Sequence, residues 1–219
     1  MNFEDYFENV YFQFYNKVDE VEFYLQNSID NHSNYALTAI PRDIKFLNIA
    51  QFYFSAFINA LTSTWEIAKL SIKIENPNSS SIRETVLTNN EAEFLRYFTG
   101  ATVQDHKLFQ FLKFSRNACS HDGTMALSGG VGNSFNFSGI IERFDFESSN
   151  NTFTHAQIEP PQGDAIKAML LMATKLVPLF EAKLKMPTRP YSFEVILPNA
   201  MTEKRQNIQN FVNKFSALL

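Results

Sequence analysis

Two residue types that can act on a phosphate ester lie close together near the middle of this chain. Residues 115–123 read Ser-Arg-Asn-Ala-Cys-Ser-His-Asp-Gly, which places Arg116 shortly before His121. An arginine carries a permanent charge that binds phosphate, and a histidine gives or takes a proton near neutral pH. Phosphate binding combined with proton transfer is chemistry that cleaves RNA, so this stretch is a candidate ribonuclease site.

The helix that must position these residues is predicted over residues 103–122. Thr102-Val-Gln-Asp105 is a helix-start signal, and Gly123 is expected to end the helix. At about 100° per residue, one face of this helix becomes the predicted core face. The residues on that face are Leu108, Leu112, Ser115 and Cys119, with Phe111 alongside.

The polar residues of the motif lie away from the predicted core face. Asn117 and His121 are four positions apart and share roughly the opposite face, near Phe114. Arg116 lies on a flank, from which its long side chain reaches round. We therefore expect these residues to face solvent or a partner subunit, and Phe114 beside them favours a partner.

An all-helical chain with Arg-Asn-x3-His near the end of a helix resembles the HEPN superfamily (higher eukaryotes and prokaryotes nucleotide-binding domain). The family pattern is Arg, often followed by a polar residue, four to six positions, and then His. The resemblance implies a helical bundle that commonly dimerises, with the motifs of both subunits in one cleft. Active members are metal-independent ribonucleases, often in toxin–antitoxin, phage-defence or RNA-processing systems.

The resemblance also implies a role for each motif residue. His121 would be the general base or acid towards the ribose 2′-OH and the 5′-leaving oxygen. Arg116 would hold the scissile phosphate and stabilise its developing charge. Asn117 would orient His121 or the phosphate. The products would carry 2′,3′-cyclic phosphate and 5′-OH ends.

Neighbours of the motif are further candidates for binding, namely Lys113, Ser120 and Asp122. Lys113 belongs to the window 106–121, which carries five basic or histidine residues and no acid. Asp122 either pairs with Arg116, tunes His121, or is ordinary helix-ending chemistry. The Cys-x-His spacing lacks the second close pair of ligands that zinc requires. We therefore expect no metal ligands, and the scheme requires no cofactor.

Hydrophobic periodicity predicts several other helices. Their expected ranges are about 3–30, 41–74, 163–185 and 202–219, with a short helix between a capping box at 88–91 and Gly100. The polar cluster 31–34 is expected to end the first helix, and 75–87 is expected to be a polar connection. Pro178 is a candidate kink, and Tyr191–Leu197 is a candidate short strand.

Residues 124–160 differ in composition from the rest of the chain. Five of the seven glycines fall within 123–139. Phe135 and Phe137 alternate with polar neighbours, as do Phe144 and Phe146, and a turn-like segment at 148–151 precedes a second candidate strand. The predicted fold is one mainly α domain over 1–219, a HEPN-like helical bundle with a β-hairpin insertion after the motif helix.

The composition of the chain excludes some classes of protein. The 219 residues are 45% hydrophobic and include 23 phenylalanines, which predicts a large, Phe-packed core. The formal charge of −4 argues against a general nucleic-acid coat protein. One cysteine fits a reducing cytoplasm, and we see no basic leader and no apolar run of the ~18 residues that a membrane span needs. We therefore expect a cytoplasmic protein with no membrane partner.

The function that the resemblance implies is a metal-independent endoribonuclease that acts on RNA at a homodimer cleft, in a toxin or phage-defence context. The family implies an antitoxin protein as a further partner. Two alternatives stay open. One is a non-catalytic nucleotide- or RNA-binding module with the same arrangement, and the other is a structural or interaction protein that uses its aromatic residues for assembly.

Overall fold

The computed structural model describes residues 3–37, 44–75, 83–117, 127–129, 135–137, 165–184 and 196–219. The elements within these ranges are, in chain order, α1 (Phe3–Leu37), α2 (Ile44–Glu75), α3 (Glu84–Asn89), α4 (Glu91–Tyr97), α5 (Val103–Asn117), β1 (Leu127–Gly129), β2 (Phe135–Phe137), α6 (Ala165–Glu181) and α7 (Ile196–Ser216). The prediction of a mainly α protein is confirmed for these ranges. No helix among them is long and apolar enough to cross a bilayer.

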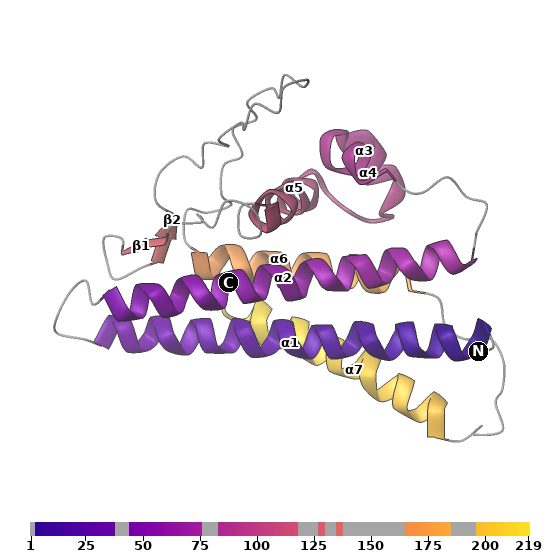
Figure 1. Ribbon diagram of the computed structural model, residues 1–219, viewed down its shortest axis with the longest axis horizontal. Helices are drawn as coiled ribbons and strands as arrows, with labels where there is room; N and C mark the ends of the chain where they lie inside the picture. Colours follow the sequence, from indigo (N-terminus) through magenta and orange to yellow (C-terminus); the bar gives the residue numbers. More distant parts are fainter. Residues whose placement is uncertain are drawn as a thin grey trace.

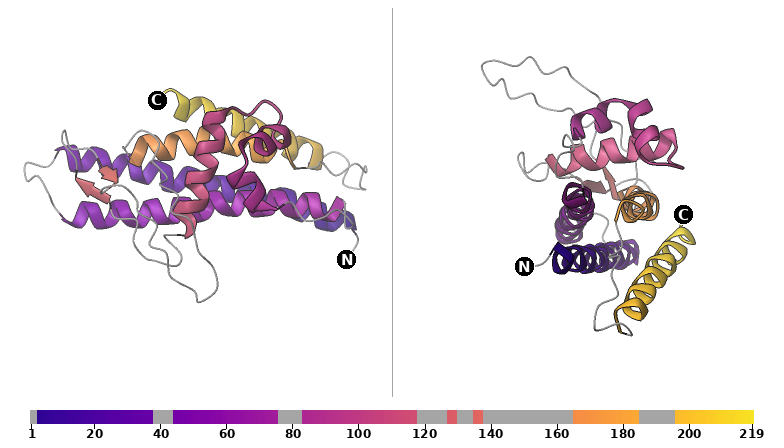
Figure 2. Two further views of the ribbon diagram at one scale, coloured as in Figure 1. Left: turned by 90° about the horizontal axis from the view of Figure 1, so that it is seen from above. Right: turned by 90° about the vertical axis from the view of Figure 1, so that its right-hand side faces the viewer.

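The helices form layers, which Figures 1 and 2 show from three directions. The two longest helices, α1 and α2, lie side by side and antiparallel. Helix α6 packs beside α2, and α7 crosses the far side of the bundle against α6 and α1. Helices α3, α4 and α5 form a cap on the opposite side, where α5 crosses both α2 and α6 (Figure 2).

Aromatic rings fill the centre of this arrangement. Trp65 on α2 is fully buried, and its ring centroid lies 5.6 Å from that of Phe109 on α5 and 5.3 Å from that of Phe180 on α6. Phe98, just after α4, lies 5.6 Å from Trp65. Tilted and edge-to-face rings at such distances attract one another beyond their burial of apolar surface. This Trp65 cluster, formed by Trp65, Phe94, Phe98, Phe109 and Phe180, therefore joins α2, α4, α5 and α6.

A polar contact between buried tyrosines of α1 and a glutamate of α6 fixes these two helices to each other. The hydroxyl of Tyr15 donates to Glu181 Oε1 at 2.8 Å, and the hydroxyl of Tyr11 lies 2.9 Å from it. A phenol has one proton, so Tyr11 donates to Tyr15 when Tyr15 donates to Glu181. Burial is the largest of the effects that raise the pKa of Tyr15 above its usual range. Both hydroxyl groups are thus hydrogen-bonded although the two tyrosine side chains are buried.

Two local capping interactions define the cap layer. The side chain of Asn90 accepts from the backbone N–H of Glu93 at 3.1 Å and starts α4, so the box expected at 88–91 is wrong in register by two residues. Gly100, at φ +85°, makes the turn after α4 in a conformation that other residues rarely adopt. The box predicted at 102–105 is confirmed, because Thr102 N–H donates to Asp105 Oδ2 at 2.7 Å and Asp105 N–H donates to Thr102 Oγ1 at 3.3 Å.

Three expected boundaries are wrong. Helix α1 continues through the polar cluster 31–34, where Ser33 bonds to the carbonyl oxygen of Ile29 within the helix instead of ending it. Residues 84–87, expected in a polar connection, are helical in α3. The last two residues of the candidate strand Tyr191–Leu197 begin α7, and residues 185–195 lie outside the described ranges. Pro178 does not break α6, which continues to Glu181.

The described part of the insert is a short pair of strands. β1 and β2 pair antiparallel, with Leu127 opposite Phe137 and Gly129 opposite Phe135. Phe135 and Phe137 are residues for which a strand was expected, but their partner precedes them in the chain. The turn expected at 148–151 and the strands around it lie outside the described residues, so the β-hairpin insertion as proposed stays a prediction.

The Trp65 cluster generates a stability prediction. Trp65→Ala removes a ring that packs against aromatic residues of α4, α5 and α6 and against the residue after α4, and leaves a cavity, so it is expected to lower the free energy of unfolding by about 3–5 kcal/mol. Phe52→Ala removes an aromatic side chain from the same helix that is 64% exposed, and is expected to cost under about 0.5 kcal/mol. Urea unfolding followed by circular dichroism measures both, and equal costs would contradict the role given to Trp65.

Candidate functional site

Helix α5 positions the candidate site by burying its other face. The predicted core face is confirmed for Leu108, Phe111, Leu112 and Ser115, none of which has any exposed surface. Phe114, expected to favour a partner subunit, is half-buried and packs against the protein's own core. The face that remains carries Lys113, Arg116 and Asn117 at the C-terminal end of the helix.

His106 fixes the beginning of the same helix. The ring is buried, and its Nε2 lies 3.0 Å from the carbonyl oxygens of both Leu87 and Thr88. Both partners are acceptors, so Nε2 carries the proton and donates. The ring also packs 5.1 Å from that of Phe94. His106 is thus a structural residue, and it holds the end of α3 against α5.

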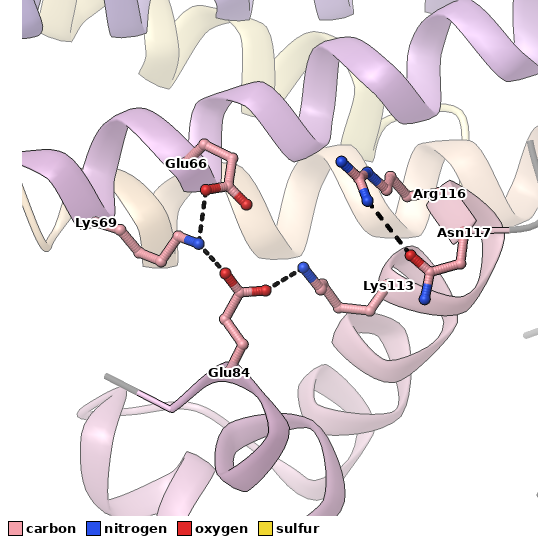
Figure 3. A network of polar contacts seen from close by, with 6 residues as sticks. All are labelled: Glu66, Lys69, Glu84, Lys113, Arg116 and Asn117. Carbon is pink, nitrogen blue, oxygen red and sulfur yellow. Dashed lines mark hydrogen bonds and ion pairs between the residues drawn. The ribbon is translucent and has the colours of Figure 1, made fainter. Parts of the chain in front are cut away.

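A group of half-buried charged residues connects α2, α3 and α5 (Figure 3). The carboxylate of Glu84, in the first turn of α3, accepts from Lys69 of α2 through one oxygen and from Lys113 of α5 through the other. Lys69 also pairs with Glu66 at 2.6 Å. The side chains of Lys69, Lys113 and Glu84 are only 11%, 16% and 27% exposed. We call Glu66, Lys69, Glu84 and Lys113 the charge network.

Burial changes the acidity of both lysines. Loss of solvent lowers the pKa of Lys113, and the neighbouring Arg116 charge lowers it further, while Glu66 opposes the change. Loss of solvent also lowers the pKa of Lys69, against the opposing effect of Glu66. Each ammonium therefore depends on nearby carboxylates to stay charged in this partly dry environment.

Arg116 differs from Lys113 in having no carboxylate partner among the described residues. Its Nη1 lies 3.5 Å from Asn117 Oδ1, at the long limit for a hydrogen bond, and no acidic side chain described by the structure lies within 4 Å of it. Figure 3 shows the guanidinium beside the charge network at the same end of α5. Its side chain is half-buried, and no carboxylate among the described residues neutralises its positive charge.

The structure describes half of the predicted site. Arg116, Asn117 and Lys113 come together at the end of α5, whereas Ser120, His121 and Asp122 belong to residues 118–126, which lie outside the described ranges. The pairing of Asp122 with Arg116, one of the expected roles of Asp122, therefore stays a prediction. Lys113, predicted to bind substrate, is paired with Glu84. The roles of these residues stay predictions.

Sequence reasoning missed the charge network. Glu84 is 15 residues from Lys69 and 29 from Lys113, so no helical spacing relates them. The predicted basic window 106–121 contains no acid, and that property hid the fact that another helix supplies one. The remaining signal was weak, because Glu66 and Lys69 form an i,i+3 pair of the kind that helix surfaces often carry.

No metal-binding cluster is present in the described ranges, where no three His, Cys, Asp or Glu side chains converge. Cys119 and His121 lie outside these ranges, so the expectation that the protein binds no metal stays a prediction.

No family model, curated protein or solved structure matches the chain. The resemblance to the HEPN superfamily thus depends on the motif residues and on the helical architecture, and it remains a prediction.

The lowered pKa of Lys113 generates a prediction about pH. Between that lowered value and the ordinary 10.5, the unfolded chain binds more protons than the folded protein, so this lysine makes the free energy of unfolding rise with pH. Lys113→Met abolishes the contribution. Relative to this variant, the wild type should gain stability as the pH rises from the lowered pKa of Lys113 towards 10.5, as measured by urea unfolding.

The matched control is Lys107→Met, which removes an exposed lysine from the same helix. An identical pH trend in the two variants would show that burial of Lys113 does not cause the effect.

Proposed function

We propose that this protein is a metal-independent endoribonuclease of the HEPN type, cytoplasmic and homodimeric, that serves in a toxin or phage-defence system. Arg116 and His121 are its catalytic pair, and Asn117 orients one of them or the phosphate. Ser120 and Asp122 line the same site. The context, the dimer and an antitoxin partner are taken from the resemblance.

The observation that carries this proposal is that no carboxylate among the described residues pairs with Arg116. The neighbouring cations Lys69 and Lys113 are neutralised by Glu66 and Glu84. A guanidinium without such a partner binds anions, and its planar fork fits two phosphate oxygens. His121 follows Arg116 closely enough in sequence to share that phosphate.

The proposed reaction is a transesterification. His121 takes the proton of the ribose 2′-OH, and the 2′ oxygen attacks the adjacent phosphorus. The bond from phosphorus to the 5′ oxygen breaks, and His121 returns the proton to that leaving oxygen. The products are a 2′,3′-cyclic phosphate and a 5′-OH. Arg116 stabilises the charge that develops on the non-bridging oxygens. Every proton is supplied by the substrate or by a side chain, so the scheme balances without a further reagent.

The same observation supports a second function, a module that binds RNA or a nucleotide without cleaving it. Binding requires only the free charge of Arg116, whereas cleavage also requires His121. The third reading, an assembly protein that uses aromatic residues, loses one argument because Phe114 packs against the core of its own chain.

The test is incubation of the purified protein with total RNA in excess EDTA, followed by end-group analysis. The wild type should release fragments with 2′,3′-cyclic phosphate ends. Arg116→Ala and His121→Ala should each slow cleavage by about 10²–10⁴-fold, through loss of charge stabilisation and of proton transfer.

The control is Arg96→Ala, which removes a 78% exposed arginine that pairs only with Glu93 on the surface of α4 among described partners. Cleavage should be unchanged in this variant. RNA binding that depends on Arg116, without cleavage, supports the binding module. Cleavage that persists in both Arg116→Ala and His121→Ala is incompatible with the proposed site.

A further inference from the structure

Two cations of α5 lie one helical turn apart and differ in what they contact. Lys113 and Arg116 are close enough that the arginine charge lowers the pKa of the lysine, and Figure 3 shows both at the end of α5 that faces α2. Arg116 has no carboxylate among the described residues, but the ammonium of Lys113 is bound by Glu84. A pair of cations at this spacing would hold one phosphate from two sides if Glu84 were absent.

Glu84 belongs to an element that is attached unequally at its two ends. Helix α3 has six residues, too few to be stable without tertiary contacts. Its C-terminal half is fixed by the buried side chain of Leu87 and by the bond from His106 to the backbone. Arg83, the N-cap residue before its first turn, is exposed and provides no side-chain cap. The first turn is therefore attached to α2 and α5 mainly through the Glu84 carboxylate.

Release of Glu84 would affect the two lysines differently. Lys69 would keep a counter-ion, because Glu66 lies 2.6 Å from its ammonium. Lys113 has no other carboxylate within 4 Å among the described residues, so it would lose its direct ion pair and keep only the longer-range attraction of Glu66. Glu84 is therefore the described carboxylate that blocks the ammonium of Lys113 beside the proposed site.

We propose that Glu84 is an internal competitor of the substrate, a carboxylate that occupies the anion-binding position of Lys113 and that an RNA phosphate bound at Arg116 displaces. The inference rests on the proposed function in taking RNA as the ligand, but it does not depend on cleavage. In this arrangement α3 lowers the affinity for RNA, because a phosphate must displace Glu84 before it can bind Lys113.

The test is a double-mutant cycle of Glu84→Gln and Lys113→Gln in the full chain. The probe is a short single-stranded 2′-O-methyl RNA, which has no free 2′-OH to attack the phosphorus, and affinity is measured by fluorescence anisotropy over a range of salt. Glu84→Gln should bind about three- to tenfold more tightly. Its affinity should also fall more steeply with salt, by about 0.7 in the slope of log affinity against log salt, as one added phosphate contact requires.

Coupling between the two positions is the decisive part of the cycle. In the wild type, Lys113→Gln should change affinity by less than about threefold, because Glu84 already neutralises that charge. In the Glu84→Gln background, it should abolish the whole gain in affinity. Glu91→Gln, which removes an exposed carboxylate from the first turn of α4, is the charge-matched control and should reproduce none of this gain.

Additive effects, or a gain in Glu84→Gln no larger than that in Glu91→Gln, would overturn the inference. If Glu84→Gln does not fold, the single variant Lys113→Gln tests the inference. A loss of RNA affinity above about threefold in this variant would mean that Lys113 contacts RNA while Glu84 is in place, and would overturn the inference. Coupled binding without any cleavage leaves the inference standing and removes the proposed enzyme. Cleavage without coupling removes only the inference, and no binding by any variant removes both.

Discussion

The packing of aromatic rings around Trp65 holds the cap layer on the long helices. Rings from α2, α5 and α6 and from the segment after α4 meet there, and each of the five side chains is at most 1% exposed. Because Phe109 is on α5, burying its ring fixes where that helix crosses α2 and α6. The rest of α5 follows as a rigid rod, so the position of Arg116 is set by an apolar contact two turns away.

This constraint explains why charged residues are half-buried beside the site. Once α5 lies across α2, Lys113 and Lys69 approach each other at the crossing, and two ammonium groups in a partly dry space repel. Glu84 resolves the conflict by bridging them. A buried ion pair adds little net stability compared with apolar packing, but breaking it leaves a costly unpaired charge. The network therefore specifies where α3 docks more than it stabilises the fold.

The sequence was sufficient for features that local spacing controls. The start of α5 at Thr102 and Asp105, its core face, and the left-handed turn at Gly100 all depend on residues within two turns of one another. It was insufficient where distant residues meet. Helix α3 is stabilised by the burial of Leu87 and His106 against other elements, and its residues 84–87 were therefore predicted to belong to a polar connection.

The same distinction applies to the site. The residue types of Arg116 and Asn117 were visible in the sequence, and so was the amphipathic helix that carries them. That Lys113 pairs with a carboxylate from another helix, while no described carboxylate pairs with Arg116, became visible only in the fold. The paired state of Lys113 changes the chemistry expected of the motif, because under the proposed function it leaves a single arginine among the described residues, rather than a basic patch, to select the phosphate.

Under the proposed function, Arg116 and His121 act on one and the same phosphate. The most direct test is to titrate ¹⁵N-labelled protein with a 2′-deoxy dinucleotide, which cannot be cleaved by this route, and to record the Arg116 Nε–H and His121 imidazole resonances. The account predicts that both shift along one binding curve in the wild type, and that the His121 shift is lost in Arg116→Ala. Shifts with different affinities, or a His121 response that survives loss of Arg116, would contradict it.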